Sequence, residues 1–163
     1  MSTATLNASV SSNAASNNSV DEAAIRAIVE NLRQSLYDKN VAKFAAQFAP
    51  NATIFNLAPP LTHHGIDNEE KQTWFDSWST PIEIEPRDFK ITISGNLAFC
   101  YGFLRMAGTK WGAPSPVSFW MRETLCLERQ GSGWQIVHEH TSVPFYMDAS
   151  TRPAFDLQPE SVS

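Results

Sequence analysis

The chain has 163 residues, which is enough for one domain with a sizeable core and too few for two ordinary domains. Hydrophobic residues make up 42% of it and aromatic residues 11%, which excludes a chain that is disordered throughout. The net charge is −5 and no run of basic residues occurs, so nucleic acid is not an expected partner.

The two ends of the chain differ from its middle in composition. Residues 1–18 are nearly all Ser, Asn, Ala and Thr, without a charge or an aromatic ring. Such a segment lacks the apolar surface that offsets chain entropy, so a disordered tail is expected there. The domain is predicted over residues 19–147, and residues 148–163 are expected to form an irregular C-terminal tail.

Cys100 and Cys126 lie in separate apolar or β-rich runs, without a spacing typical of a metal site. Two free thiols are expected in a reducing compartment. No run approaches the ~18 apolar residues of a membrane-spanning helix, and no secretory signal is recognisable. We therefore predict a cytoplasmic protein that has no membrane partner.

Three helices are predicted in the first half of the domain. Ser19 and the glutamate three residues later fit a capping box, and apolar residues at helical spacing follow. Asn40 can cap a second, shorter helix, which Pro50 ends. A third helix, with Trp74 on its buried side, follows a short strand. The first helix is predicted to end near Lys39, the strand to span 53–57 and the third helix to span about 67–78.

After Pro81 the pattern changes to that of strands separated by turns. Three helices followed by an antiparallel meander are typical of an α+β fold. The strands are predicted over residues 82–94, 97–107, 117–129 and 134–143.

Local motifs resemble known families. The FAPNAT segment at 48–53 resembles the helix-to-strand step of ketosteroid isomerase and SnoaL-like cyclases. Segments 97–106 and 123–142 resemble the association domain of calcium/calmodulin-dependent protein kinase II, most specifically in the Trp-x-x-Val-His-x-His-x-Ser pattern that starts at Trp134. These resemblances identify residues 20–145 with the nuclear transport factor 2-like superfamily. They imply a cone in which a curved antiparallel sheet wraps around three helices and an internal pocket.

The same resemblances disfavour two specific functions. Leu32, Asn56 and Leu125 stand where the isomerase has its oxyanion tyrosine, its aspartate base and its second oxyanion acid. Steroid isomerisation by that apparatus is therefore not expected. Of the arginines in the pocket of the association domain, Arg105 has a clear counterpart, whereas Leu125 and Thr141 occupy two other positions. A strongly anionic ligand is thus disfavoured.

Alternation along each strand sorts its residues into two faces. The face with more large apolar residues is expected to line the pocket, and it brings Arg105, Glu123 and Glu139 into an apolar cup. The other face is expected to point outward and to mediate a homodimer or a larger assembly. The expected pocket face includes Phe99, Tyr101, Phe103, Arg105, Met121, Glu123, Leu125, Glu139 and Thr141, and the expected outer face Leu104, Trp120, Trp134 and Ile136.

The loop between the last two strands decides how the charges meet. A three-residue loop places Glu123 opposite Glu139, and the two carboxylates then repel unless Arg105 neutralises them. A four-residue loop, or a β-bulge, places Glu123 opposite His140 and forms an acid–base dyad. His138 and His140 share one face without a third ligand, so no metal site is predicted.

Two functions remain open from the sequence. The first is a cofactor-free enzyme that isomerises, cyclises, dehydrates or hydrolyses a small, mostly apolar molecule by general acid–base catalysis. Glu139 would be the base or acid, Glu123 its partner and Arg105 the charge stabiliser. The second is a non-catalytic ligand-binding or oligomerisation module. Contacts with the small-molecule ligand are expected from Asn56, Trp74, Tyr101, His140 and Thr141.

Overall fold

The computed structural model describes residues 4–131 and 133–160 and confirms the predicted α+β fold. This part of the chain forms three helices and one six-stranded sheet. The first two helices precede the first strand, and the third lies between the second and third strands. The helices are α1 (Ala4–Asp38), α2 (Val41–Ala45) and α3 (Asn68–Asp76), and the strands are β1 (Phe48–Phe55), β2 (His63–His64), β3 (Glu83–Ser94), β4 (Leu97–Gly108), β5 (Val117–Gln130) and β6 (Gly133–Ser142).

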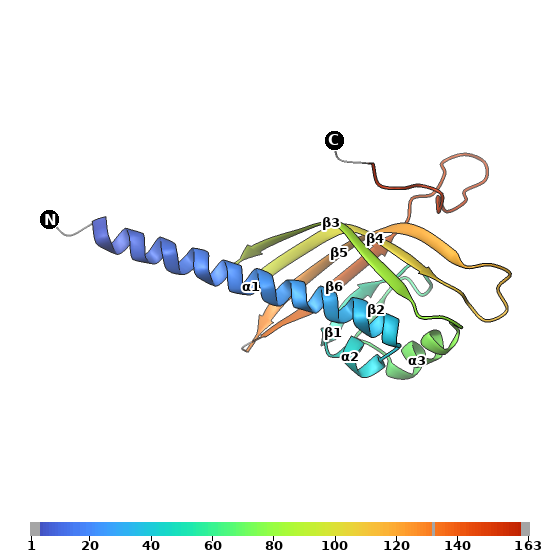
Figure 1. Cartoon of the computed structure of the whole chain (residues 1–163), viewed down its shortest axis with the longest axis horizontal. Helices are drawn as coiled ribbons and strands as arrows, with labels where there is room; N and C mark the ends of the chain where they lie inside the picture. The colour runs from blue at the N-terminus through green and yellow to red at the C-terminus, as the bar shows by residue number, and fades with distance from the viewer. Residues whose placement is uncertain (1–3, 132, 161–163) are drawn as a thin grey trace.

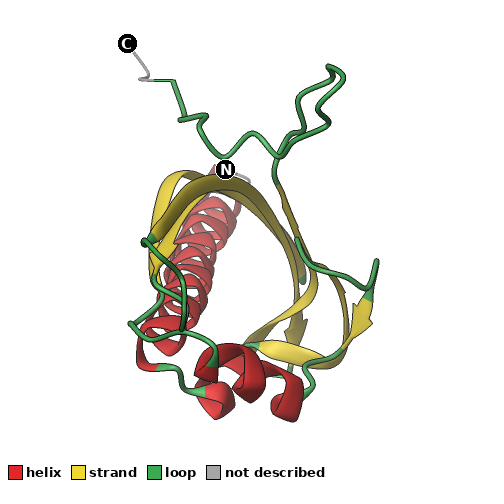
Figure 2. Ribbon diagram, turned by 90° about the vertical axis from the view of Figure 1, so that its right-hand side faces the viewer, coloured by secondary structure: helices red, strands yellow, loops and turns green. Residues whose placement is uncertain are grey.

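The strands form one open sheet in the order β2-β1-β6-β5-β4-β3. The sheet curves around the helices, which lie on its concave side (Figure 2). Strands β3 to β6 form the predicted antiparallel meander, but β1 runs parallel to β6. The last strand of the meander, β6, returns to lie beside β1 and runs in the same direction. The elements between β1 and β6 form the crossover that a parallel pair needs.

Helix α1 begins at Ala4, so residues 4–18 are helical where a disordered tail was expected, and Ser19 lies inside the helix. This part of α1 extends beyond the end of the sheet (Figure 1). A helix that packing has already nucleated can add residues at small cost, since each adds one backbone hydrogen bond. Among the α1 side chains that are described, from residue 18 onward, the first in the hydrophobic core is Ile25. The domain boundary at residue 19 remains a prediction, and residues 1–3 lie outside the described part.

Residues 148–160 have no helix or extended strand, but part of this segment packs onto the domain. Ala154 is 2% exposed, and the rings of Phe119 and Phe155 are 4.4 Å apart. The guanidinium of Arg87 on β3 donates hydrogen bonds to the carbonyl oxygens of Pro159 and Glu160. The expected irregular tail is thus attached to the sheet as far as residue 160.

The expected faces of β4 are reversed. Gly102 lies opposite Glu123 on β5, so the even-numbered residues of β4 face the concave side. Tyr101 and Arg105 lie on the convex side instead. The neighbouring strand explains the reversal, because a Cβ atom on Gly102 would lie 2.9 Å from the Cα atom of Phe89. A small residue is needed there, whatever the alternation of large residues suggests.

A β-bulge in β6 corrects the expected outer face as well. Cys126 pairs with His138 and Leu127 with Ile136, so Val137 is an extra residue in the ladder. The bulge turns Trp134 and Ile136 inward, where they are 7% and 0% exposed.

Two apolar clusters fill the concave side and meet at Glu123. On β5, Phe119 and Met121 belong to the second core, which contains Phe75 and Trp78. Leu125 and Leu127 follow Glu123 and belong to the main core, together with Ile25, Ile28 and Leu32 of α1. The side chain of Glu123 is therefore a carboxyl group between two apolar clusters.

Candidate functional site

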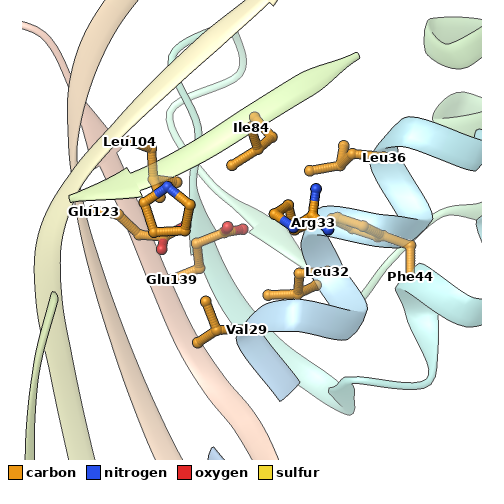
Figure 3. A pocket seen from close by; sticks show the side chains of 10 residues that line it. Val29, Leu32, Arg33, Leu36, Phe44, Ile84, Leu104, Glu123 and Glu139 are labelled. Carbon is orange, nitrogen blue, oxygen red and sulfur yellow. The ribbon is translucent and has the colours of Figure 1, made fainter. Parts of the chain in front are cut away.

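A cavity of about 30 Å³ lies between α1 and the concave face of the sheet (Figure 3). This is space for one or two water molecules. The polar side chains at its surface are Arg33 of α1, Glu123 of β5 and Glu139 of β6. Its apolar walls include Val29, Leu32, Leu36, Phe44, Ile84 and Leu104.

Glu123 and Glu139 both face the cavity, as predicted, but in neither expected register. Glu123 lies opposite Thr141, and Glu139 lies opposite Leu125. The two-residue connection between Gln130 and Gly133 alone would place His140 opposite Glu123, and the bulge moves the register by one further residue. The glutamates are therefore diagonal neighbours on adjacent strands, close enough for their charges to interact.

The two carboxyl groups share an environment that disfavours their charged forms. Glu123 is 6% exposed, and neither glutamate carboxyl has a hydrogen bond with any other described residue. Burial raises the pKa of Glu123 well above its usual value, and the charge of Glu139 raises it further. Burial also raises the pKa of Glu139, but the charge of Lys71 opposes this shift. The pair can therefore hold one proton, with Glu123 as its preferred position.

The cation near this pair is Lys71 of α3, which sequence reasoning missed. Its Nζ atom lies 4.3 Å from the ring centre of Phe44 and 4.9 Å from that of Trp74. Burial lowers the pKa of Lys71, whereas the charges of Glu139 and Glu70 raise it. Lys71 precedes Trp74 by three residues and so shares its helical face. The signal in the sequence is that one charged residue, Lys71, lies on the helical face that Trp74 was predicted to bury.

Arg105 does not take part in this site. It lies on the convex side, and its Nη2 atom is 2.7 Å from Oε2 of Glu85 on β3. The expectation that it neutralises the two glutamates is wrong because the faces of β4 are reversed.

The residues expected to contact a ligand fall into three places. Thr141 is 9% exposed beside Glu123, and Trp74 lies against Lys71. Asn56 and His140 line a wide, open hollow of about 790 Å³ at the end of β1, apart from the cavity. Tyr101 is 45% exposed on the convex side. The structure thus brings Glu123, Glu139, Thr141 and Trp74 toward one region and leaves the other predicted residues elsewhere.

Within residues 4–131 and 133–160, no three His, Cys, Asp or Glu side chains are grouped as a metal ion would require. In the same part of the chain, no helix has the length and apolar character to cross a membrane. Cys100 and Cys126 are both free thiols.

Residues 25–146 match the SnoaL-like domain family. The protein belongs to this family. No curated protein matches the chain. A crystal structure of a nuclear transport factor 2-like protein of unknown function from Pseudomonas putida is 25% identical to this SnoaL-like protein, with a TM-score of 0.75 over 87% of this chain and 98% of that one.

Two structures named as enzymes share the fold at lower identity. A protein from Novosphingobium aromaticivorans, provisionally named a scytalone dehydratase, is 12% identical, with a TM-score of 0.70 over 86% of this SnoaL-like chain and 97% of that one. A hexachlorocyclohexane dehydrochlorinase is 11% identical, with a TM-score of 0.66 over 77% and 86% of the two chains. Proteins provisionally named as a ketosteroid isomerase and as a kinase II association domain have TM-scores of 0.58 and 0.61, in line with the resemblance seen in the sequence.

Proposed function

We propose that this SnoaL-like protein is a cofactor-free enzyme that moves protons on a small, mostly apolar organic molecule by general acid–base catalysis. The observation that carries the proposal is the pair of glutamates, Glu123 buried and Glu139 half-buried, that lack hydrogen bonds and face the cavity. Two such groups destabilise a fold, so a structural role gives no reason to keep them.

The unequal environments of the two glutamates assign their roles. Glu139 faces the charge of Lys71, so it ionises first and accepts a proton from the substrate. Glu123 keeps its proton and donates it to the departing or rearranging group. A dehydration or an isomerisation balances in this scheme, because one proton is taken at one atom and one is given at another. The dehydratase and dehydrochlorinase names among the similar structures agree with chemistry of this type.

A titration of the carboxyl groups tests the proposal. Carbon-13 NMR of labelled glutamate should show the signals of Glu123 and Glu139 titrating as a coupled pair, above the usual value of about 4.3. Lys71→Met should raise the apparent pKa of Glu139 further, because it removes the charge that opposes the shift. Arg105→Met, on the other side of the sheet, is the matched control and should change neither value. Titration of both glutamates near 4.3 would show solvated groups and overturn the catalytic proposal.

A specific surface also favours self-association as a second function. Phe99 and Tyr101 stack on the convex side with ring centres 6.2 Å apart, and they are 44% and 45% exposed. On the far strands of the same side, Phe55 packs edge-on against His138 and His140. Exposed aromatic side chains on β1 and β4 of the same face, with two histidines of β6 beside Phe55, are unusual on the free surface of a monomer. We propose that two copies of the chain pack through this convex face.

Light scattering at micromolar concentration is expected to report at least twice the chain mass of 18.1 kDa. Tyr101→Glu should shift the protein toward the monomer, since it places a charge in the centre of the contact. Tyr37→Glu is the control, because Tyr37 is similarly exposed at 44% but lies on α1. A wild-type monomer at every concentration would refute the dimer.

A further inference from the structure

Arg33 is the arginine of α1 whose side chain reaches the cavity. Its Nε atom donates to Oε2 of Glu30 at 2.8 Å, and its Nη2 atom donates to Oε1 at 2.6 Å. These two bonds occupy one edge of the planar guanidinium. The opposite edge, formed by Nη1 and the second hydrogen of Nη2, has no partner among residues 4–131 and 133–160. An arginine with one free edge can still bind a second carboxylate through two parallel hydrogen bonds.

The ion pair with Glu30 does not explain why an arginine lies at the cavity. The side chains of Arg33 and Glu30 are 34% and 59% exposed, so their interaction is screened and contributes little to stability. Arg26 also donates two hydrogen bonds to a glutamate of the same helix, both to Oε1 of Glu22, and Arg26 does not line the cavity. Glu30 also has a second positive charge near it, because the charge of Lys43 helps to lower the pKa of Glu30.

We propose that the substrate is a small organic acid whose carboxylate binds the free edge of Arg33 while its apolar body enters the cavity toward the glutamates. The identity of the substrate rests on the proposed function. Arg33 lies on α1, and Glu123 and Glu139 lie on the facing strands (Figure 3). The acid would therefore be held at one end while its reacting carbon meets Glu139 at the other. Leu32 and Leu36, beside Arg33, provide apolar contacts for the body between them.

The size of the cavity sets a condition on this binding. With about 30 Å³, it is too small for an organic acid in its present form. Binding therefore requires the cavity walls to move apart, and the exposed pair of Arg33 with Glu30 offers little resistance to a movement of Arg33. The sequence disfavoured an anionic ligand because Leu125 and Thr141, both on strands, stand where the association domain has arginines. Arg33 supplies the positive charge from the helix.

A matched pair of probes tests the proposal. Phenylacetate and phenylacetamide have the same shape, and only the first is an anion. At pH 7 in low salt, calorimetry should show the acid binding at least about tenfold more tightly than the amide to the wild-type protein. Arg33→Gln should reduce this preference to about one, chiefly by weakening the binding of the acid. Arg33→Lys should give an intermediate preference, because it keeps the charge and loses the two-bond geometry.

Arg26→Gln is the control, since it removes the matching arginine outside the cavity and should keep the wild-type preference. The proposal is overturned if the wild type binds both probes equally, binds neither, or keeps its preference in Arg33→Gln. The carboxyl titration reports on the proposed function by itself. A coupled titration without acid preference refutes only the anionic substrate, whereas ordinary titration of both glutamates refutes the enzyme.

Discussion

Replacement of Glu123 by leucine is expected to raise the free energy of unfolding at pH 7 by about 1–3 kcal/mol, because it removes a carboxyl group whose charged form is disfavoured by burial and by the charge of Glu139. The carboxyl has no hydrogen bond with any described residue and lies between two apolar clusters, so leucine removes a polar group and keeps most of the volume. The same variant should lose the catalytic activity proposed for the cavity, because it lacks the proton donor. A site kept for function at the expense of stability behaves in this way.

The pH dependence of the gain follows from the direction of the pKa shift. The pKa of Glu123 is higher in the folded than in the unfolded protein, so the folded state binds its proton more tightly. Stability from this group is complete below the unfolded value of about 4.3 and is lost as pH rises toward the folded pKa. The advantage of Glu123→Leu should therefore be small near pH 4 and should grow with pH.

Chemical denaturation of both proteins between pH 4 and pH 8 measures this difference. Glu128→Leu is the control on the same strand, because Glu128 is exposed, and its effect should stay within about 0.5 kcal/mol. A clear loss of stability in Glu123→Leu at pH 7 would mean that the glutamate has a structural partner, and would argue against its assignment as the proton donor.

Asp21→Ala is expected to lower the free energy of unfolding by about 1–3 kcal/mol, because it leaves two donors unpaired. Oδ2 of Asp21 accepts from Nη2 of Arg129 at 2.5 Å, and Oδ1 accepts from Nε1 of Trp134 at 3.2 Å. Trp134 is 7% exposed, so water cannot easily replace the lost acceptor. These bonds join α1 to the hairpin of β5 and β6, which carries both glutamates.

The hydrogen bond from Arg129 is the main cause that lowers the pKa of Asp21, with Trp134 acting in the same direction. The folded pKa is thus below the unfolded value of about 3.9, and the stabilisation is present above that value and lost as pH falls. The deficit of Asp21→Ala should therefore be full at pH 7 and should shrink in acid. Glu22→Ala, which breaks the exposed pair with Arg26, is the control and should cost no more than about 0.5 kcal/mol. An equal deficit in the two variants at pH 7 would contradict the argument.

Local signals were sufficient for the order of the elements. Asn40 and Asp67 cap α2 and α3 through their side chains, and both ends could be anticipated from the residue types. The strands of the meander begin and end within a few residues of their predicted limits. These features depend on near neighbours in the chain, which a single sequence displays directly.

The predictions that were wrong concern features that depend on contacts between segments far apart in the sequence. The faces of β4 depend on Phe89 of another strand, which leaves no room for a side chain at position 102. The partner of Glu123 depends on one extra residue at Val137, and nothing in the local pattern marks a bulge there. The two acids of the cavity were still found, because glutamates on the apolar face of a strand are conspicuous. Lys71, whose charge acts on Glu139, and Arg33, at the other end of the cavity, come from helices that the strand pattern cannot place.

Strand β3 is irregular near its middle, where Phe89 lies against Gly102 of β4. β3 is an edge strand of 12 residues, long enough to invite pairing with a strand of another molecule. Pro86 lacks an amide hydrogen, Asp88 has a φ of 53°, and the register shifts between Arg87 and Lys90. The row of unpaired backbone N–H and C=O groups along β3 is therefore interrupted at its middle. At the opposite edge of the sheet, β2 has only two residues. Fibre growth by strand addition is thereby blocked at both edges, so crowded solutions should hold discrete particles rather than filaments.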